Sequence, residues 1–286
     1  MKTIQLHQQH QQALLVLLGE FDRICKKLDI PYVLFAGTLL GAVRHQGFIP
    51  WDDDLDILMM RSDYDRFLRE AEAHIDSEKF FLQKEFTEHW PMFFSKLRLN
   101  HTTCLEKYHP RDPQSHQGVY IDIFPCDNAL SSQLGRKLQF FASKVVIAKA
   151  LDRRGYETDS KKKKVFMAVC RMLPTGLFLR FAKKGREDSR YVHTFFGGAS
   201  GFTPNVYERA WFAQRTELKF AYGDYPVPTQ YDQLLRHIYG EYMILPPEEQ
   251  RNIKQHAILI DLDRPYTDYQ DYREGMTFDV YTRSIR

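Results

Sequence analysis

The sequence lacks the features of a membrane-spanning, secreted or disulfide-rich protein. No stretch reaches the ~18 uncharged apolar residues that a spanning helix requires, and the nearest, residues 165–182, is interrupted by Arg171, Pro174 and Arg180. Residues 1–12 are polar and rich in His and Gln, so we expect no signal peptide. The four cysteines form no CxxC pair, which favours a reducing compartment. We therefore expect a cytoplasmic protein, with a peripheral contact at the inner face of the membrane left open.

The sequence also has little net charge, only +3, but the charge is unevenly distributed. Residues 131–190 contain sixteen basic and five acidic residues, an excess of eleven that leaves the rest of the chain at −8. Apolar residues such as Leu138, Phe141 and Val145 recur there at helical spacing. We expect a basic helical region that is either a solvated face or a platform for an anionic, lipid-linked acceptor. No helix-turn-helix or aromatic-interleaved pattern accompanies it, so nucleic-acid binding is not expected.

The remaining sequence has neither internal repeats nor Gly/Ser linkers, and its periodicity indicates a mixed α/β fold. Helical spacing predicts helices over residues ~11–29 and 231–239, the second ended by Gly240. Buried strands are expected over residues 32–35, 80–83, 92–99 and 119–124. A short helix through Val43 would be capped by Thr38, and a helix after residue 60 by a capping box beginning at Ser62.

A dense group of carboxylates follows the loop at residues 48–51. Residues 52–60 predict a strand on which Asp52, Asp54 and Asp56 share one face, because side chains alternate along a strand. An exposed acidic turn is the ordinary interpretation of such a group. Here the acids are surrounded by apolar residues, where like charges repel and burial opposes ionisation. A divalent cation with oxygen ligands would remove that cost, so we expect Mg²⁺, or Mn²⁺ as the alternative.

The residues before these acids predict the other half of a phosphate site. Gly37 and Thr38 lie at a strand-to-helix turn, where backbone N–H groups attract anions. Arg44 and His45 follow and are candidates for contacts with donor phosphates, although surface polarity would also explain them. On the expected strand 119–124, a lone acid such as Asp122 is more often an ion-pair partner than a ligand, but its place after the acidic strand makes it the natural third carboxylate of the site.

The segment Gly37-Thr38-Leu39-Leu40-Gly41-Ala42-Val43-Arg44-His45-Gln46-Gly47-Phe48-Ile49-Pro50-Trp51-Asp52-Asp53-Asp54-Leu55-Asp56-Ile57 resembles the signature of the LicD family of phosphotransferases. So do residues 120–125 and the late segment 239–243. The resemblance covers most of the chain and is weakest over residues 131–200. About twenty matched positions are far more specific than a short motif.

This resemblance implies a nucleotidyltransferase-like core with a small mixed sheet, an α/β (α+β) fold, plus the basic helical region. We expect a catalytic core at 1–130, the basic helices at 131–200 and a segment at 201–286 that completes a single LicD-type domain. Asp54, Asp56 and Asp122 are implied as Mg²⁺ ligands, and Asp122 is chosen as the catalytic base. Asp52 would be either a further ligand or an acid that supports the ligands without contacting the metal. Arg44 and Lys96 would stabilise the leaving phosphate. An edge-strand charge is the simpler explanation of Lys96.

The implied reaction is transfer of phosphocholine from CDP-choline to a hydroxyl of a cell-surface glycan such as a teichoic acid, lipopolysaccharide or capsule precursor, with release of CMP. Phosphoryl transfer needs alignment of the reacting oxygens and neutralisation of phosphate charge, which metal ions and cationic side chains supply. The alternatives are transfer of ribitol phosphate or glycerol phosphate from other CDP-linked donors, and nucleotidyl transfer. A non-enzymatic alternative is a membrane-associated scaffold that uses the basic helices.

Overall fold

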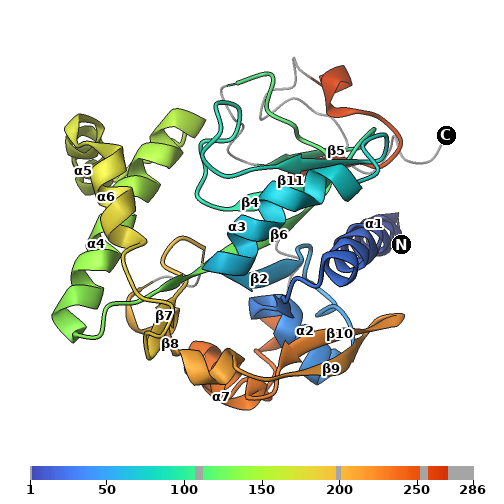
Figure 1. The fold of residues 1–286 in the computed structure, drawn as a ribbon. Coiled ribbons are helices and arrows are strands. Elements are labelled where there is room, and N and C mark those ends of the chain that lie inside the picture. Colours follow the sequence, from blue (N-terminus) through green and yellow to red (C-terminus); the bar gives the residue numbers. More distant parts are fainter. Residues whose placement is uncertain (1, 107–111, 198–200, 252–256, 270–286) are drawn as a thin grey trace.

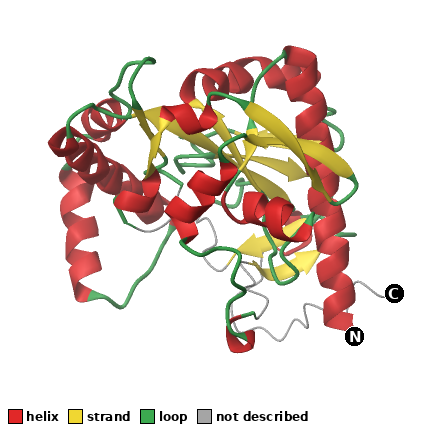
Figure 2. Cartoon of the chain, turned by 90° about the horizontal axis from the view of Figure 1, so that it is seen from below, coloured by secondary structure: helices red, strands yellow, loops and turns green. Residues whose placement is uncertain are grey.

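The computed structural model describes residues 2–106, 112–197, 201–251 and 257–269, and its strands lie between helices on both sides (Figures 1 and 2). The helices are α1 Lys2–Leu28, α2 Ala36–His45, α3 Arg61–Glu70, α4 Gln133–Arg154, α5 Lys161–Met172, α6 Thr175–Ala182 and α7 Tyr231–Tyr239. The strands are β1 Val33–Leu34, β2 Asp56–Met60, β3 Phe80–Gln83, β4 Ser95–Leu99, β5 Thr103–Glu106, β6 Tyr120–Asn128, β7 Tyr191–His193, β8 Val206–Glu208, β9 Arg215–Phe220, β10 Gly223–Pro228 and β11 Ala257–Asp261. The prediction of a mixed α/β fold is confirmed.

The largest sheet has the strand order β1-β2-β6-β4-β3, and β7 and β8 extend it from the far end of β6. Strands β2 and β6 run parallel, whereas β6 and β4 run antiparallel. Two short antiparallel pairs, β9–β10 and β5–β11, stand outside this sheet. The single parallel contact brings the starts of β2 and β6 together, which positions the acids that the two strands carry.

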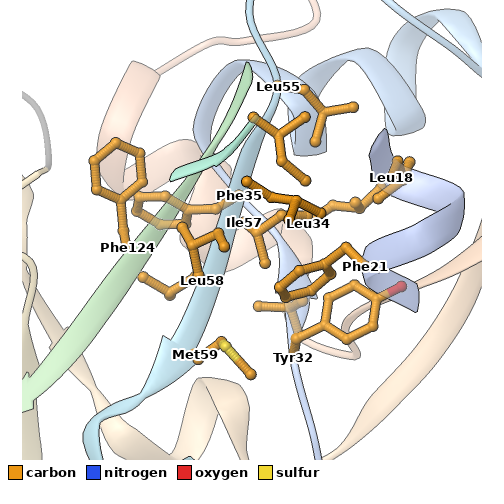
Figure 3. Packing of buried hydrophobic residues seen from close by; sticks show 14 of the residues in the cluster. Leu18, Phe21, Tyr32, Leu34, Phe35, Leu55, Ile57, Leu58, Met59 and Phe124 are labelled. Carbon is orange, nitrogen blue, oxygen red and sulfur yellow. The ribbon is translucent and has the colours of Figure 1, made fainter. Parts of the chain in front are cut away.

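The main hydrophobic core lies between α1 and the central strands. Phe21 on α1 contacts the Tyr32 ring edge-on, with 5.0 Å between ring centroids. Figure 3 shows both rings beside Ile57, while Leu58 points toward Phe124 on the neighbouring strand. Burying one such side chain contributes about 1.5–3 kcal/mol relative to leaving it exposed. The apolar residues of β2 therefore anchor the strand from both of its faces.

Several predicted boundaries need correction. The first helix begins at Lys2 and not near residue 11, and β1 contains only Val33–Leu34. Helix α2 has Phe35 at its N-cap position and no side-chain cap. Thr38 lies inside the helix, and its hydroxyl accepts the backbone N–H of Asp56. The capping box at Ser62 is wrong as well: α3 starts at Arg61 without a side-chain cap. The helix over 231–239, ended by Gly240, and the strand over 80–83 agree with the structure.

The basic region forms α4, α5 and α6, which gather on the side of the molecule away from α1 (Figure 1). Ala142, Val146 and Ala150 on α4 pack against Ala182 of α6 in a second apolar cluster. In the described part of the chain no single helix has the length and apolarity to cross a membrane. Helices α5 and α6 would pass that test together, but they meet at an angle of 102°.

Acidification is expected to destabilise the fold through His193. Burial lowers the pKa of this histidine to about 4, although Asp127 beside it acts in the opposite direction. In the unfolded chain the imidazole takes up its proton near the ordinary pKa of 6.5, so stability is lost as the pH falls from that value toward 4. At about pH 4.5 the loss is about 2.5 kcal/mol.

Urea denaturation at neutral pH and at about pH 4.5 measures this effect. In His193→Gln the difference in unfolding free energy between the two pH values should shrink. His101→Gln, at an exposed histidine, is the control and should keep the wild-type difference. An unchanged pH dependence in His193→Gln would assign the acid sensitivity to other groups.

Candidate active site

The starts of β2 and β6 place two carboxylates side by side. Asp56 is the first residue of β2 and pairs in register with Asp122 on β6. The backbone N–H of Asp56 donates to the Thr38 hydroxyl at 2.8 Å, and that of Asp122 donates to the Leu55 carbonyl at 2.9 Å. Helix α2 and both strands therefore fix the positions from which these side chains project.

Asp52, Asp53 and Asp54 lie in the loop before β2, so the predicted strand over 52–60 is wrong for its first four residues. The Asp52 N–H donates to the Ile49 carbonyl at 2.9 Å, which turns the chain. The alternation of side chains that was expected to align Asp52, Asp54 and Asp56 therefore applies only from Asp56 onward. Asp52, Asp53 and Asp54 are therefore positioned by a turn and not by the face of a strand.

Helix α1 holds this acidic loop through its polar first half. The Gln11 side-chain amide donates to the Asp52 carbonyl at 3.0 Å, and His10 Nε2 lies 2.9 Å from the Asp53 carbonyl. Burial lowers the pKa of His10, so it is neutral at pH 7 and its Nε2–H donates to the Asp53 carbonyl. Sequence reasoning missed both residues. The only signal was the unexplained run of His and Gln at residues 7–12.

The loop acids meet the geometric requirements of a cation site. One carboxylate oxygen from each of Asp52, Asp53 and Asp54 lies within 4.8 Å of the others, a spacing that a single ion with ligands at 2.0–2.6 Å can span. Burial, followed by the charges of Asp54, Asp122 and Asp52, raises the pKa of Asp56 well above its ordinary value. Crowded carboxylates of this kind are what a hard divalent cation neutralises. Asp56 lies within electrostatic range of Asp54 and Asp122. Among the described residues, however, the group close enough to share one ion is Asp52, Asp53 and Asp54, and it includes neither Asp56 nor Asp122.

Behind Asp122 lies a buried ionic network. Lys96 on β4 is 1% exposed, and its Nζ lies 3.0 Å from Asp122 Oδ1 and 3.6 Å from Glu106 Oε1. Glu106 also pairs with Arg154, the last residue of α4. Burial lowers the pKa of Lys96, opposed by Asp122 and Glu106. For Asp122, burial raises the pKa although Lys96 acts against it.

The explanation of Lys96 as an edge-strand charge is wrong, because β4 lies inside the sheet between β6 and β3. The Nζ also sits 3.0 Å from the centroid of the Tyr120 ring. Lys96 was predicted as a donor ligand from an apolar strand. Its partner Glu106, and the pairing of Glu106 with Arg154, were not predicted, since no local pattern links Glu106 to a residue 48 positions away.

The remaining predicted donor-binding residues lie on α2. A Cβ on Gly37 would stand 2.8 Å from Asp52 Oδ2, so the absent side chain lets the acidic loop approach the helix. Arg44 donates from Nη1 to the Tyr242 carbonyl at 2.8 Å and from Nε to His45 Nε2 at 3.0 Å. Burial, then the nearby Arg251, lowers the pKa of Arg44.

Two aromatic residues near these groups were not predicted as site residues. Burial raises the pKa of Tyr239, and Asp56, Asp52 and Asp54 raise it further, so this phenol lies within electrostatic range of the acids. Its side chain is nevertheless 44% exposed and open to a ligand. The Trp51 ring lies 5.9 Å from the Arg251 guanidinium and 6.3 Å from the His45 ring. The site therefore combines acids, cations and aromatic rings.

Comparison with known proteins agrees with this geometry. Residues 29–129 match the family model described as LicD/FKTN/FKRP, nucleotidyltransferase domain. The chain is 26% identical over 270 residues to the lipopolysaccharide cholinephosphotransferase LicD of Haemophilus influenzae, covering 90% of this chain and 98% of that protein.

Two uncharacterized rickettsial proteins share shorter segments with it. The protein of Rickettsia typhi is 44% identical over 62 residues, covering 22% of this chain and 20% of that protein. The protein of Rickettsia prowazekii is 51% identical over 51 residues, covering 18% and 19%. The matched family model contains both strands that carry Asp56 and Asp122. Residues 29–129 thus match the nucleotidyltransferase domain of the LicD family, and the chain is similar to a LicD protein along most of its length.

Proposed function

We propose that this protein transfers phosphocholine from CDP-choline to a hydroxyl of a cell-surface glycan and releases CMP. The observation that carries the proposal is the near-complete alignment with a lipopolysaccharide cholinephosphotransferase. The paired acids Asp56 and Asp122 are the chemical feature of the fold that supports it. The acceptor in this proposal is a lipid-linked glycan precursor, met by a cytoplasmic protein at the inner face of the membrane.

Mg²⁺, with Mn²⁺ as the alternative, is proposed to be held by Asp54, Asp56 and Asp122, with Asp52 as a further ligand. When bound, such an ion would neutralise charge on the donor pyrophosphate. Without it the acids repel one another, which adds to the effect of burial in raising the pKa of Asp56. The carboxylate oxygens of the loop are the ligands that Mg²⁺ prefers.

In the proposed reaction the acceptor hydroxyl oxygen attacks the phosphorus that bears choline. The new P–O bond forms while the bond from that phosphorus to the CMP oxygen breaks, so CMP leaves with the bonding electrons. Asp122 is the proposed base for the hydroxyl proton, since burial raises its pKa toward neutrality. Lys96 is proposed to act on the donor through Asp122, which it contacts at 3.0 Å. Gly37, Thr38, Arg44 and His45 are the proposed donor-binding residues.

CMP release from CDP-choline in the presence of Mg²⁺ tests the proposal, with CDP-ribitol and CDP-glycerol as parallel donors. We expect CMP from CDP-choline and little from the others, and a faster reaction when a glycan acceptor is added. CMP formed preferentially from CDP-ribitol or CDP-glycerol would reassign the transferred group. No binding or turnover of any CDP-linked donor, with or without acceptor, would overturn the proposal in favour of a membrane-associated scaffold.

Nucleotidyl transfer is the second candidate, because the matched family model is described as a nucleotidyltransferase domain. The two reactions leave different products. Phosphocholine transfer frees CMP, whereas nucleotidyl transfer attaches CMP to the acceptor and frees phosphocholine. Mass analysis of the acceptor therefore separates the two candidates in one experiment.

A further inference from the structure

Helices α4, α5 and α6 carry an exposed apolar surface that the proposed reaction does not use. Of the fifteen large apolar side chains exposed among the described residues, eight belong to these three helices. Val165 and Met172 on α5 are 65% and 80% exposed, and Leu177 on α6 is 65% exposed. Such a concentration on one part of a surface marks an interaction site. We call this surface the apolar face.

Two shallow grooves run across the apolar face and meet at one side chain. The first lies between α4 and α5, where Phe141, Val169 and Leu173 line it. The second lies between α4 and α6, where Phe141, Leu177 and Phe181 line it. Because Phe141 belongs to both, the grooves form a continuous apolar surface across the three helices.

Basic residues surround the apolar face. From residue 133 to 182 the chain has twelve basic and three acidic residues. Four of the basic residues, Lys161 to Lys164, form the first turn of α5, which contains no acid. Lysines there oppose the helix dipole, which favours negative charge at a helix N-terminus. Lys161 and Lys162 also line the first groove, so the positive charge adjoins the exposed apolar side chains directly.

The combination of exposed apolar side chains and adjoining positive charge indicates which kind of partner binds this surface. A second copy of the chain would bring two strongly basic surfaces together, and their like charges would repel. An anionic bilayer matches both properties, since acyl chains take the apolar side chains and headgroups take the lysines. The 102° bend between α5 and α6 also suits a helix pair lying along a surface, because a straight span would need one continuous axis.

We propose that α5 and α6 are a bilayer-binding element that inserts the apolar face among acyl chains and places Lys161–Lys164 at anionic headgroups. The inference does not rest on the transferase reaction, because it depends only on surface residues far from the acids in sequence. It names the surface through which the chain would reach a lipid-linked acceptor. Its test measures binding to lipid without any donor or acceptor.

Flotation of the full chain with vesicles tests the proposal. Wild type should float with vesicles of phosphatidylcholine and phosphatidylglycerol and stay unbound with phosphatidylcholine alone. Lys162→Glu with Lys163→Glu should weaken binding by about tenfold or more, and added salt should weaken the wild-type binding. Lys27→Glu, at an exposed lysine of α1, should bind like wild type.

The apolar contribution has a closely matched control. Val165→Ser on α5 should reduce vesicle binding, whereas Val16→Ser, at a valine of α1 that is 53% exposed, should not. Circular dichroism on each variant confirms that the helices remain folded. Equal loss in both valine variants, equal binding to neutral and anionic vesicles, or no binding to either would overturn the proposal. So would self-association through the apolar face in the absence of lipid binding.

Insertion can be measured separately from attraction by charge. All four native cysteines are buried, so Met172→Cys introduces an exposed thiol for a polarity-sensitive dye. The emission maximum of this dye should shift to shorter wavelength when the protein binds anionic vesicles. The emission maximum of the same dye on Val16→Cys should not shift. A dye at position 172 that stays in water while the protein floats would contradict insertion and overturn the proposal as stated.

Discussion

Replacing Asp56 with asparagine is expected to abolish CMP release and, in the absence of metal, to make the protein more stable. Burial and three neighbouring acids raise the pKa of Asp56 well above the ordinary value. A carboxyl whose pKa is raised by folding opposes folding at every pH above its ordinary value of 3.8, because burial and the neighbouring acids penalise its negative charge in the folded state only. Asparagine removes that charge, and we expect Tm to rise by about 2–4 °C. Activity should fall by about 10³-fold or more, because the proposed metal site loses a ligand.

Thermal unfolding with and without Mg²⁺ provides the decisive comparison. Wild type should be stabilised by Mg²⁺, since an ion that binds only the folded state raises Tm, and Asp56→Asn should respond much less. Asp224→Asn, at an exposed aspartate on β10, should match wild type in activity and in its response to Mg²⁺. If Asp56→Asn lowered Tm without metal, Asp56 would be a structural acid and not part of a repulsive cluster.

Replacing Lys96 with methionine is expected to have the largest effect on stability. Lys96 is buried between Asp122 and Glu106, so its loss leaves two carboxylates without their shared cation. Breaking a buried ion pair on one side typically costs about 3–5 kcal/mol. CMP release should fall as well, because Asp122 would no longer be held in place. Chemical denaturation and the CMP assay measure the two effects.

A second substitution separates charge from packing in this network. Adding Glu106→Gln to Lys96→Met removes one of the two carboxylates that faced Lys96 and should recover part of the lost stability, although Arg154 then loses its partner. Activity should stay low in the double variant, since Asp122 still lacks its partner. Lys219→Met, at an exposed lysine, is the control for loss of a lysine as such. A stable and active Lys96→Met would show that Asp122 needs no cation beside it.

The sequence predicts the acids but not the way the chain brings them together. Asp56 and Asp122 were expected on two strands that contribute to one site, and the structure pairs them in register on neighbouring strands. The loop before Asp56 was taken as strand because acids at every second residue resemble strand alternation. Its course depends on hydrogen bonds from His10 and Gln11, more than forty positions earlier, and no local propensity contains that information.

The difference between local sequence patterns and contacts between distant residues also explains the wrong prediction at Thr38 and the incomplete prediction at Lys96. A threonine near a helix start normally caps its own helix, but Thr38 accepts an N–H from the next strand because the strand begins beside it. Lys96 was identified as important from its apolar strand. Its pairing with Glu106 depends on strand order, and that of Glu106 with Arg154 on the packing of α4 against residues 90–93, just before β4. Tertiary contacts therefore decide each case in which local patterns failed.

The close approach of helix α2 to the segment that leads into the acidic loop has a consequence for the cost of binding. A Cβ on Gly41 would lie 2.4 Å from the Gly47 carbonyl oxygen, so the two backbones touch with no side chain between them. Together with the contacts from α1, this contact leaves the loop little conformational freedom before any ligand arrives. Ordering a flexible loop consumes free energy that would otherwise appear as affinity. A donor that meets this loop finds it already rigid, so its binding energy remains for aligning the reacting atoms.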